Sequence, residues 1–257
     1  MIKAAFFDVD GTLLSYKTRM VPESAKRAIA KLQQQGILCI VATGRHMIQM
    51  SKLPVADVPF DAFVMLNGQL VLDKAQKVLF GVPIEGKTKE FLIENFNNHT
   101  YPAIIVEEKE MYLNYVTDHV EDVHKIIAVT MPPLSDYRGG DIYQVCAYLR
   151  PEEEHLVDPI KADCVMTGWH YGGKDIIAAG GGKMAGIKRY LELTGIAPEE
   201  IIAFGDAEND LEMIRFAGIG VAMVNAEEKV KAVADYVTAD IDDDGIEKAL
   251  QHFGLIE

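Results

Sequence analysis

The chain has 257 residues, 49% of them hydrophobic, which suffices for one large domain or two modest ones with an apolar core. Its 25 basic and 39 acidic residues give a formal net charge of −14, which opposes binding to nucleic acids. No apolar run approaches the roughly 20 residues of a membrane helix, and the N-terminus lacks the pattern of a signal peptide. The three cysteines are widely spaced, which argues against disulfides and a zinc site. We expect a cytoplasmic protein with neither a nucleic-acid partner nor a membrane.

The first predicted element is a short buried strand that ends in two carboxylates. Residues 4–7 are apolar, and Asp8, Asp10 and Gly11 follow. Residues i and i+2 of an extended chain share a face, so the two carboxylates can point the same way. Two acids in so small a volume repel each other unless a cation or a shared proton relieves them. An ordinary polar turn at the end of a strand is the alternative at this point.

The next elements complete a βαβ unit. Residues 22–35 have the apolar spacing of a helix, with a proline in the first turn and a glycine directly after the end. The apolar run 37–42 is typical of a buried parallel strand, and it stops at Thr43. Because βαβ units are right-handed and parallel, Thr43 should lie at the same edge of the sheet as Asp8.

A third apolar strand is predicted at residues 62–66, and Asn67-Gly68 ends it. This dipeptide is typical of a hairpin, and the runs 70–72 and 78–80 can pair beyond it. We interpret Asn67-Gly68 as a simple turn.

The pattern changes between residues 82 and 179, where short strands alternate with helices. Helices are predicted at 87–96 and 120–128. Strands are predicted at 104–106, 111–115, 142–149, 164–167 and 175–179. This mixture fits a small α+β domain inserted into the first one. We therefore predict a discontinuous core of residues 1–82 and 180–257, and an inserted domain of residues 83–179.

Three glycines at positions 180–182 and Lys183 bring the chain back from the insertion. A phosphate-binding P-loop does not fit, because Ile177 and Met184 stand where that motif needs Gly and Ser or Thr. Lys183 comes at the start of the next helix, predicted at 185–193, where a cation is unfavourable for the helix dipole. This local cost makes Lys183 a candidate functional residue.

The C-terminal part begins with a buried strand at 201–204, followed by Asp206, Asn209 and Asp210. A helix over 211–217, strands at 219–222 and 236–237, and helices at 227–234 and 246–253 are predicted beyond it. The acidic run 240–244 is interpreted as a solvated cap for the last helix.

Polar groups thus follow several strand ends or chain crossings at one presumed edge of the sheet, where open α/β sheets place ligands. In order they resemble the four motifs of the haloacid dehalogenase superfamily: Asp8-Val9-Asp10-Gly11-Thr12, Thr43-Gly44-Arg45, Lys183, and Gly205-Asp206-x-x-Asn209-Asp210. Asn67-Gly68, the insertion after the third strand and Met213 are similar to the Cof-type branch with a type IIB cap. One departure is Met184, where members often have glycine after the lysine.

The resemblance implies a fold and an activity. The fold is α/β, with a Rossmann-like core whose parallel sheet carries helices on both faces, plus the inserted α+β cap. The activity is that of a hydrolase, a Mg²⁺-dependent phosphatase that cleaves small phosphomonoesters, sugar phosphates or similar, through an aspartyl-phosphate. Asp8 would be the nucleophile, and Asp10 would move the protons.

The resemblance also implies the binding residues. Mg²⁺ would be held by Asp8, the Asp10 carbonyl and Asp206, with Asp210 in support. Phosphate would be held by Thr43, Gly44, Lys183 and Asn209. Arg45 would contact the phosphate or the substrate body, or would be a plain surface residue. Candidate substrate contacts in the insertion are Glu107, Tyr112 and Tyr143.

Other functions remain open. A phosphomutase would use the same machinery, and a non-catalytic sugar-phosphate sensor would bind without turnover. A receiver domain of a signalling protein also combines acids, Thr and Lys around Mg²⁺, but it is about half this length. Flavin mononucleotide and pyridoxal phosphate are further candidate substrates. The expected partner is a small phosphorylated metabolite, and the chain is expected to be a monomer or a homodimer.

Overall fold

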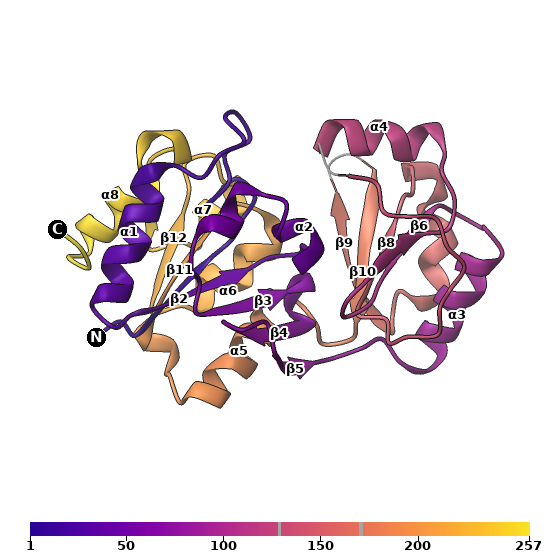
Figure 1. Ribbon diagram of the computed structural model, residues 1–257, viewed down its shortest axis with the longest axis horizontal. Coiled ribbons are helices and arrows are strands. Elements are labelled where there is room, and N and C mark those ends of the chain that lie inside the picture. Colours follow the sequence, from indigo (N-terminus) through magenta and orange to yellow (C-terminus); the bar gives the residue numbers. More distant parts are fainter. Residues whose placement is uncertain (128–129, 170–171) are drawn as a thin grey trace. The chain divides into compact units, whose positions relative to one another are not determined.

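The computed structural model describes residues 1–127, 130–169 and 172–257 (Figure 1). They form two compact units. The first consists of Met1–Phe80 together with Lys183–Glu257, and the second consists of Gly81–Gly182. No helix in the described part of the chain is both long and apolar enough to cross a membrane. Each unit has its own sheet and its own apolar core.

The first unit is built on an eight-stranded sheet with the order β13-β12-β11-β1-β2-β3-β4-β5. Its strands are β1 (Ala4–Phe7), β2 (Leu38–Ala42), β3 (Ala62–Met65), β4 (Leu70–Asp73), β5 (Val78–Gly81), β11 (Ile201–Gly205), β12 (Ile219–Ala222) and β13 (Tyr236–Val237). β1 pairs in parallel with β2 on one side and with β11 on the other. β3 and β4 form the antiparallel hairpin that was predicted. The chain builds outward from β1 in both directions, so the carboxyl end of β1 is a topological switch point.

Helices cover both faces of this sheet. They are α1 (Glu23–Gln34), α2 (Met47–Met50), α5 (Lys183–Thr194), α6 (Leu211–Phe216), α7 (Glu228–Lys231) and α8 (Gly245–His252). On one face the Phe6 ring packs edge-on against Tyr190 of α5, with the ring centroids 6.0 Å apart. On the other face Cys39 Sγ lies 3.8 Å from the carbonyl oxygen of Ile29 in α1. The predicted Rossmann-like core is confirmed.

The predicted helices of the first unit differ from the observed ones by one to three residues at their ends, and α5, for example, begins at Lys183 rather than at residue 185. Pro22 precedes α1 rather than joining it, because its ψ of 142° is extended. α7 ends at Lys231 instead of continuing to residue 234, because the chain turns into the edge of the sheet. There Asp235 N donates to Gly220 O at 2.8 Å, and the Asp235 carboxylate accepts from Gly220 N at 2.7 Å. These two hydrogen bonds replace further helical ones.

The acidic run 240–244 directly precedes the C-terminal helix, but the predicted capping is not found, because Asp244 at the N-cap of α8 makes no side-chain hydrogen bond to the helix. The Asp240 carboxylate accepts from Asp242 N at 2.9 Å, and Asp244, with a left-handed φ of 56°, directly precedes α8. Asp242 does more than face solvent, because its Oδ2 accepts from Ser15 Oγ at 2.8 Å. The run therefore also holds the loop that follows β1.

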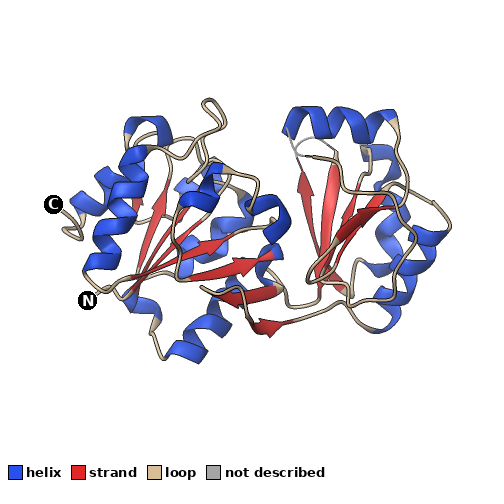
Figure 2. Cartoon of the chain, in the orientation of Figure 1, coloured by secondary structure: helices blue, strands red, loops and turns tan. Residues whose placement is uncertain are grey.

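The second unit contains a five-stranded antiparallel sheet with the order β7-β6-β8-β10-β9 (Figure 2). Its strands are β6 (Ala103–Val106), β7 (Met111–Leu113), β8 (Gln144–Ala147), β9 (Cys164–Trp169) and β10 (Gly173–Ala178), and its helices are α3 (Gly86–Asn97), α4 (Asp118–Ile127) and the 3-10 helix η3 (Pro151–Ile160). Residue 128, the last of one predicted helix, lies outside the described residues. The helix η3 was not predicted, because it lacks a helical apolar period and only Val157 and Ile160 of its residues are buried. The predicted α+β insertion is confirmed.

Candidate active site

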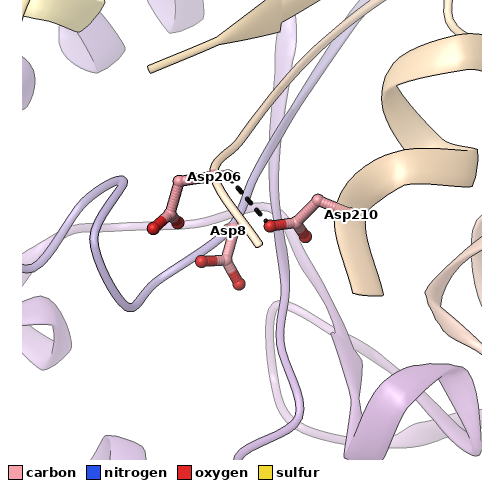
Figure 3. Close-up of side chains that lie close together, drawn as sticks. All are labelled: Asp8, Asp206 and Asp210. Carbon is pink, nitrogen blue, oxygen red and sulfur yellow. Dashed lines mark hydrogen bonds between the residues drawn. The ribbon is translucent and has the colours of Figure 1, made fainter. Parts of the chain in front are cut away.

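The site lies where three neighbouring parallel strands of the first unit end. Asp8 directly follows β1, Thr43 follows β2, and Asp206 follows β11. Since β1 lies between β2 and β11, these strand ends are adjacent although the residues are far apart in the chain. Figure 3 shows the side chains of Asp8, Asp206 and Asp210 gathered in one space. One carboxylate oxygen from each lies within 4.8 Å of the others.

Asp210 is placed by a tight turn at the start of α6. Its Oδ2 accepts from the backbone N–H groups of Asp206 at 3.0 Å and of Ala207 at 3.1 Å (Figure 3 shows the first). A side chain on Gly205 would not fit, because a Cβ there would lie 2.5 Å from Asp210 Cβ. Asp210 is completely buried. The glycine of this motif therefore makes room for a buried carboxylate.

Lys183 brings a positive charge into the carboxylate cluster. It is the first residue of α5 and is only 2% exposed. Its Nζ lies 2.5 Å from Asp8 Oδ1 and 2.7 Å from Asp210 Oδ1. Burial alone would lower the pKa of Lys183, but the nearby charges of Asp210 and Asp8 and their hydrogen bonds outweigh it and raise the pKa. The ammonium therefore stays charged. Its pairing with Asp8 and Asp210 compensates for the unfavourable position of a cation at the start of a helix.

One ammonium does not balance this cluster. Burial, with repulsion from Asp210, raises the pKa of Asp8 well above its ordinary value, although Lys183 acts in the opposite direction. Burial and repulsion from Asp210 likewise raise the pKa of Asp206 to about 7. Carboxylate oxygens are the donors that Mg²⁺ and other hard divalent cations prefer. The donor set and its excess negative charge therefore fit a divalent cation.

Asp206 is oriented by Thr12, to which no role was assigned from the sequence, and by Asn225, which was not predicted at all. Thr12 Oγ1 donates to Asp206 Oδ1 at 3.1 Å, and Asn225 Nδ2 donates to Asp206 Oδ2 at 3.2 Å. Asn225 also donates to the Gly11 carbonyl at 3.0 Å, which joins it to the turn after β1. Thr12 belongs to the first motif. Asn225 comes three residues after the end of β12. The pattern that identified Asp8, Thr43 and Asp206, a polar residue after a buried parallel strand, therefore also points to this loop.

Asp10 pairs with Arg45 rather than with the carboxylate cluster. Arg45 Nε lies 2.6 Å from Asp10 Oδ2, and Arg45 Nη2 lies 2.7 Å from Asp10 Oδ1. Burial would lower the pKa of Arg45, but the hydrogen bond and charge of Asp10 raise it. The Arg45 side chain is 16% exposed. Its geometry is that of a two-pronged ion pair that fixes the Asp10 carboxylate.

Asn67 joins the second motif to the fourth, because it bonds both Thr43 and Asn209. Asn67 is buried, with a left-handed φ of 51°, and its Oδ1 accepts from Asn209 Nδ2 at 3.1 Å. Asn67 N donates to Thr43 O at 3.0 Å, and a Cβ on Gly44 would lie 3.0 Å from Asn67 Nδ2. The turn was predicted, but the place of its asparagine in the site was missed.

The candidate substrate contacts in the insertion are largely buried within the second unit. Tyr112 is completely buried, and its hydroxyl donates to Glu107 Oε1 at 2.6 Å and accepts from Arg138 N at 3.1 Å. The hypothesis that Tyr112 contacts substrate is therefore wrong, because this side chain belongs to the core of the second unit. Tyr143 is 9% exposed.

Comparison with known proteins gives this geometry a context. Residues 5–250 match the model of the haloacid dehalogenase-like hydrolase family. The chain is 31% identical to the putative phosphatase YkrA of Bacillus subtilis, over 99% of each chain. Its fold matches BT1666, a phosphatase of the haloalkanoate superfamily from Bacteroides thetaiotaomicron, with 34% identity and a TM-score of 0.89, over 100% of this chain and 96% of the other. It also matches the subclass IIB sugar phosphatase BT4131, with 33% identity and a TM-score of 0.87, over 99% and 100%. As its motifs predict, the chain belongs to the family of haloacid dehalogenase-like hydrolases.

Proposed function

We propose that this hydrolase is a Mg²⁺-dependent phosphatase that cleaves small phosphomonoesters, such as sugar phosphates, through a phosphoryl group carried by Asp8. The observation that carries the proposal is the buried Asp8 carboxylate, held by Lys183 and facing two further carboxylates. The phosphatase names of YkrA, BT1666 and BT4131 support the reaction class, and that of BT4131 supports sugar phosphates.

In this mechanism Asp8 attacks the phosphorus atom. A bond forms between the Asp8 carboxylate oxygen and phosphorus, the bond to the leaving alcohol breaks, and water later hydrolyses the aspartyl-phosphate. Lys183 orients Asp8 through Oδ1 and offsets negative charge on the transferring group. Asp8, Asp206 and the Asp10 carbonyl, with Asp210 nearby, would hold Mg²⁺, which would supply the charge that lets an anionic phosphate approach a carboxylate.

Asp10 handles the protons. It donates one to the leaving alkoxide and then accepts one from the water that attacks the aspartyl-phosphate. Arg45 donates to both carboxylate oxygens of Asp10, which holds this carboxylate in place to accept the proton from water; to carry the proton for the alkoxide, one Asp10 oxygen must leave this pairing. Arg45 is thus proposed as a positioning residue.

Thr43 and its neighbours are proposed to bind the phosphate oxygens. Thr43 Oγ1 accepts from Arg45 N at 3.1 Å, so its hydroxyl proton is directed elsewhere and can be donated to a phosphate. The Gly44 amide and Asn209 would donate beside it. Asn67 orients Asn209 by accepting from its amide.

Removing the metal should stop the reaction. With EDTA, phosphate release from a panel of phosphomonoesters should fall to background, and added Mg²⁺ should restore it, because the carboxylate cluster then regains its counter-charge. Mg²⁺ at 100 times its Kd should also add about 2.7 kcal/mol to the free energy of unfolding. Phosphate assays and thermal unfolding measure both effects. Full hydrolysis in EDTA would contradict metal dependence, transfer to a second hydroxyl would indicate a mutase, and binding without turnover would indicate a sensor.

Asp10→Asn should slow turnover by about 10²- to 10⁴-fold, the usual contribution of general acid–base catalysis. The amide can neither donate the proton to the alkoxide nor accept one from water. Arg45→Lys is the companion variant, because lysine keeps the charge but loses the two-pronged pairing. It should lower kcat with little change in KM if Arg45 acts through Asp10. A large rise in KM instead would indicate direct contact with substrate.

A further inference from the structure

The loop after β1 is held in a defined shape beside the site. Ser15 N donates to Met20 O at 3.1 Å, and Arg19 N donates to Ser15 O at 3.0 Å. Ser15 Oγ accepts from the backbone N–H groups of Lys17 and Thr18, both at 3.1 Å, and donates to Asp242. The acidic run near the C-terminus therefore anchors the backbone of this loop on both sides of residue 16.

Tyr16 lies against the turn that separates the two motif aspartates from the loop. Gly11 has a φ of 83°, and a Cβ built on it would lie 2.7 Å from Tyr16 Cε2 and would overlap Asp206 Oδ2. The Tyr16 ring and the Asp206 carboxylate thus flank the same glycine. Tyr16 is nevertheless 57% exposed, so much of its surface faces solvent next to the site.

Tyr16 is also near Arg45, which pairs with the proposed proton donor Asp10. The phenol contributes to the raised pKa of Arg45, although less than Asp10 does, so it lies within electrostatic reach of the guanidinium. Asp10 is proposed to give its proton to the leaving alcohol. Gly11, against which the Tyr16 ring lies, directly follows Asp10 in the chain, so the ring is close to the group that meets the leaving alcohol.

We propose that Tyr16 is a specificity residue of the catalytic unit, whose ring packs against the alcohol part of the substrate and favours alcohols that carry a ring. The proposal rests on the proposed phosphatase function. An aromatic side chain offers a large, rigid face that stacks on heteroaromatic rings and on the apolar faces of sugars. Because the Asp242 anchor already restricts the loop, little further ordering is needed on binding.

Steady-state kinetics of Tyr16→Ala and Tyr16→Phe test the proposal with three substrates: glucose 6-phosphate, pyridoxal phosphate and the ring-free glycerol 3-phosphate. In Tyr16→Ala, kcat/KM should fall about tenfold for a ring-bearing substrate, which is a typical loss for one stacking contact. The loss should be mainly in KM, with less than a twofold change for glycerol 3-phosphate. Tyr16→Phe keeps the ring and should stay within threefold of wild type. A loss confined to one ring-bearing substrate identifies a sugar or a heterocycle as the preferred alcohol.

Met20→Ala is the matched control, because Met20 is a large exposed side chain in the same loop. It should leave all three kcat/KM values within twofold. Asp242→Asn, which weakens the anchor, should shift selectivity in the same direction as Tyr16→Ala but less. Equal losses on all three substrates in Tyr16→Ala, or no loss on either ring-bearing substrate, would overturn the inference while the phosphatase function stands. A wild-type protein that releases no phosphate from any phosphomonoester would overturn both.

Discussion

Asp8→Asn should abolish phosphate release, with a loss in kcat on the order of 10⁶-fold, as expected when a catalytic nucleophile is removed. The amide oxygen is a poor nucleophile and cannot carry the phosphoryl group. Wild-type enzyme that is incubated with substrate radiolabelled in its phosphoryl group and then quenched with acid should retain label on the protein. The Asp8→Asn variant should retain none. Hydrolysis at a wild-type rate in this variant would exclude the covalent mechanism.

The fold should survive this substitution. Burial and the neighbouring carboxylates raise the pKa of Asp8 well above its ordinary value, so its charged form opposes folding near neutral pH. A raised carboxyl pKa means that this destabilisation is absent at low pH and grows as pH rises toward the folded-state pKa. The neutral amide avoids it, so the Tm of metal-free Asp8→Asn at pH 8 should not fall below that of wild type. Asp57→Asn, the same change at an exposed position, is the control for both assays.

Lys183→Met should have the largest effect on stability. Removing the ammonium leaves Asp8 and Asp210 buried without their cation, and breaking a buried ion pair in this way costs about 3–5 kcal/mol. Because the chain has two units, hydrogen exchange of the β1 and β11 amides reports the loss better than a global signal. Activity should also fall to background, since Asp8 loses its orientation.

Two further variants separate charge from packing at Lys183. Lys183→Met combined with Asp210→Asn should be less destabilised than the sum of the single changes, because the second removes a charge that the first leaves unpaired. Lys87→Met, at an exposed lysine, should change stability by no more than about 0.5 kcal/mol. Unchanged exchange of the β1 amides in Lys183→Met would show that the lysine does not hold the cluster together.

Much of this arrangement could be predicted because parallel strands concentrate polar residues at one edge of a sheet. Asp8, Thr43 and Asp206 each follow a continuous apolar run, and that pattern is visible without any structure. Lys183 was identifiable for a different reason, because a lysine at a helix start is locally unfavourable and needs compensation from elsewhere.

The pairings between side chains could not be predicted. Arg45 could have faced solvent or substrate, and its pairing with Asp10 depends on how two loops meet. Asn67 was interpreted as a turn residue because Asn-Gly is typical of hairpins. The turn is present, but the dipeptide does not indicate that the Asn67 side chain bonds Asn209. Asp242 belongs to a run of acids whose members are indistinguishable in sequence, and only packing selects the one that bonds Ser15.

The central place of β1 has a consequence for folding. β1 pairs with β2 some 35 residues later and with β11 nearly 200 residues later, as the pairs Ala4–Leu38 and Ala4–Ile201 show. Gly81–Gly182 is one continuous segment with its own apolar core, whereas β1 must wait during synthesis for Ile201–Gly205. Contacts of such long range are slow to form. The nascent chain therefore carries Asp8 long before Ile201–Gly205 is made, and the proposed catalytic centre can form only after that strand has appeared.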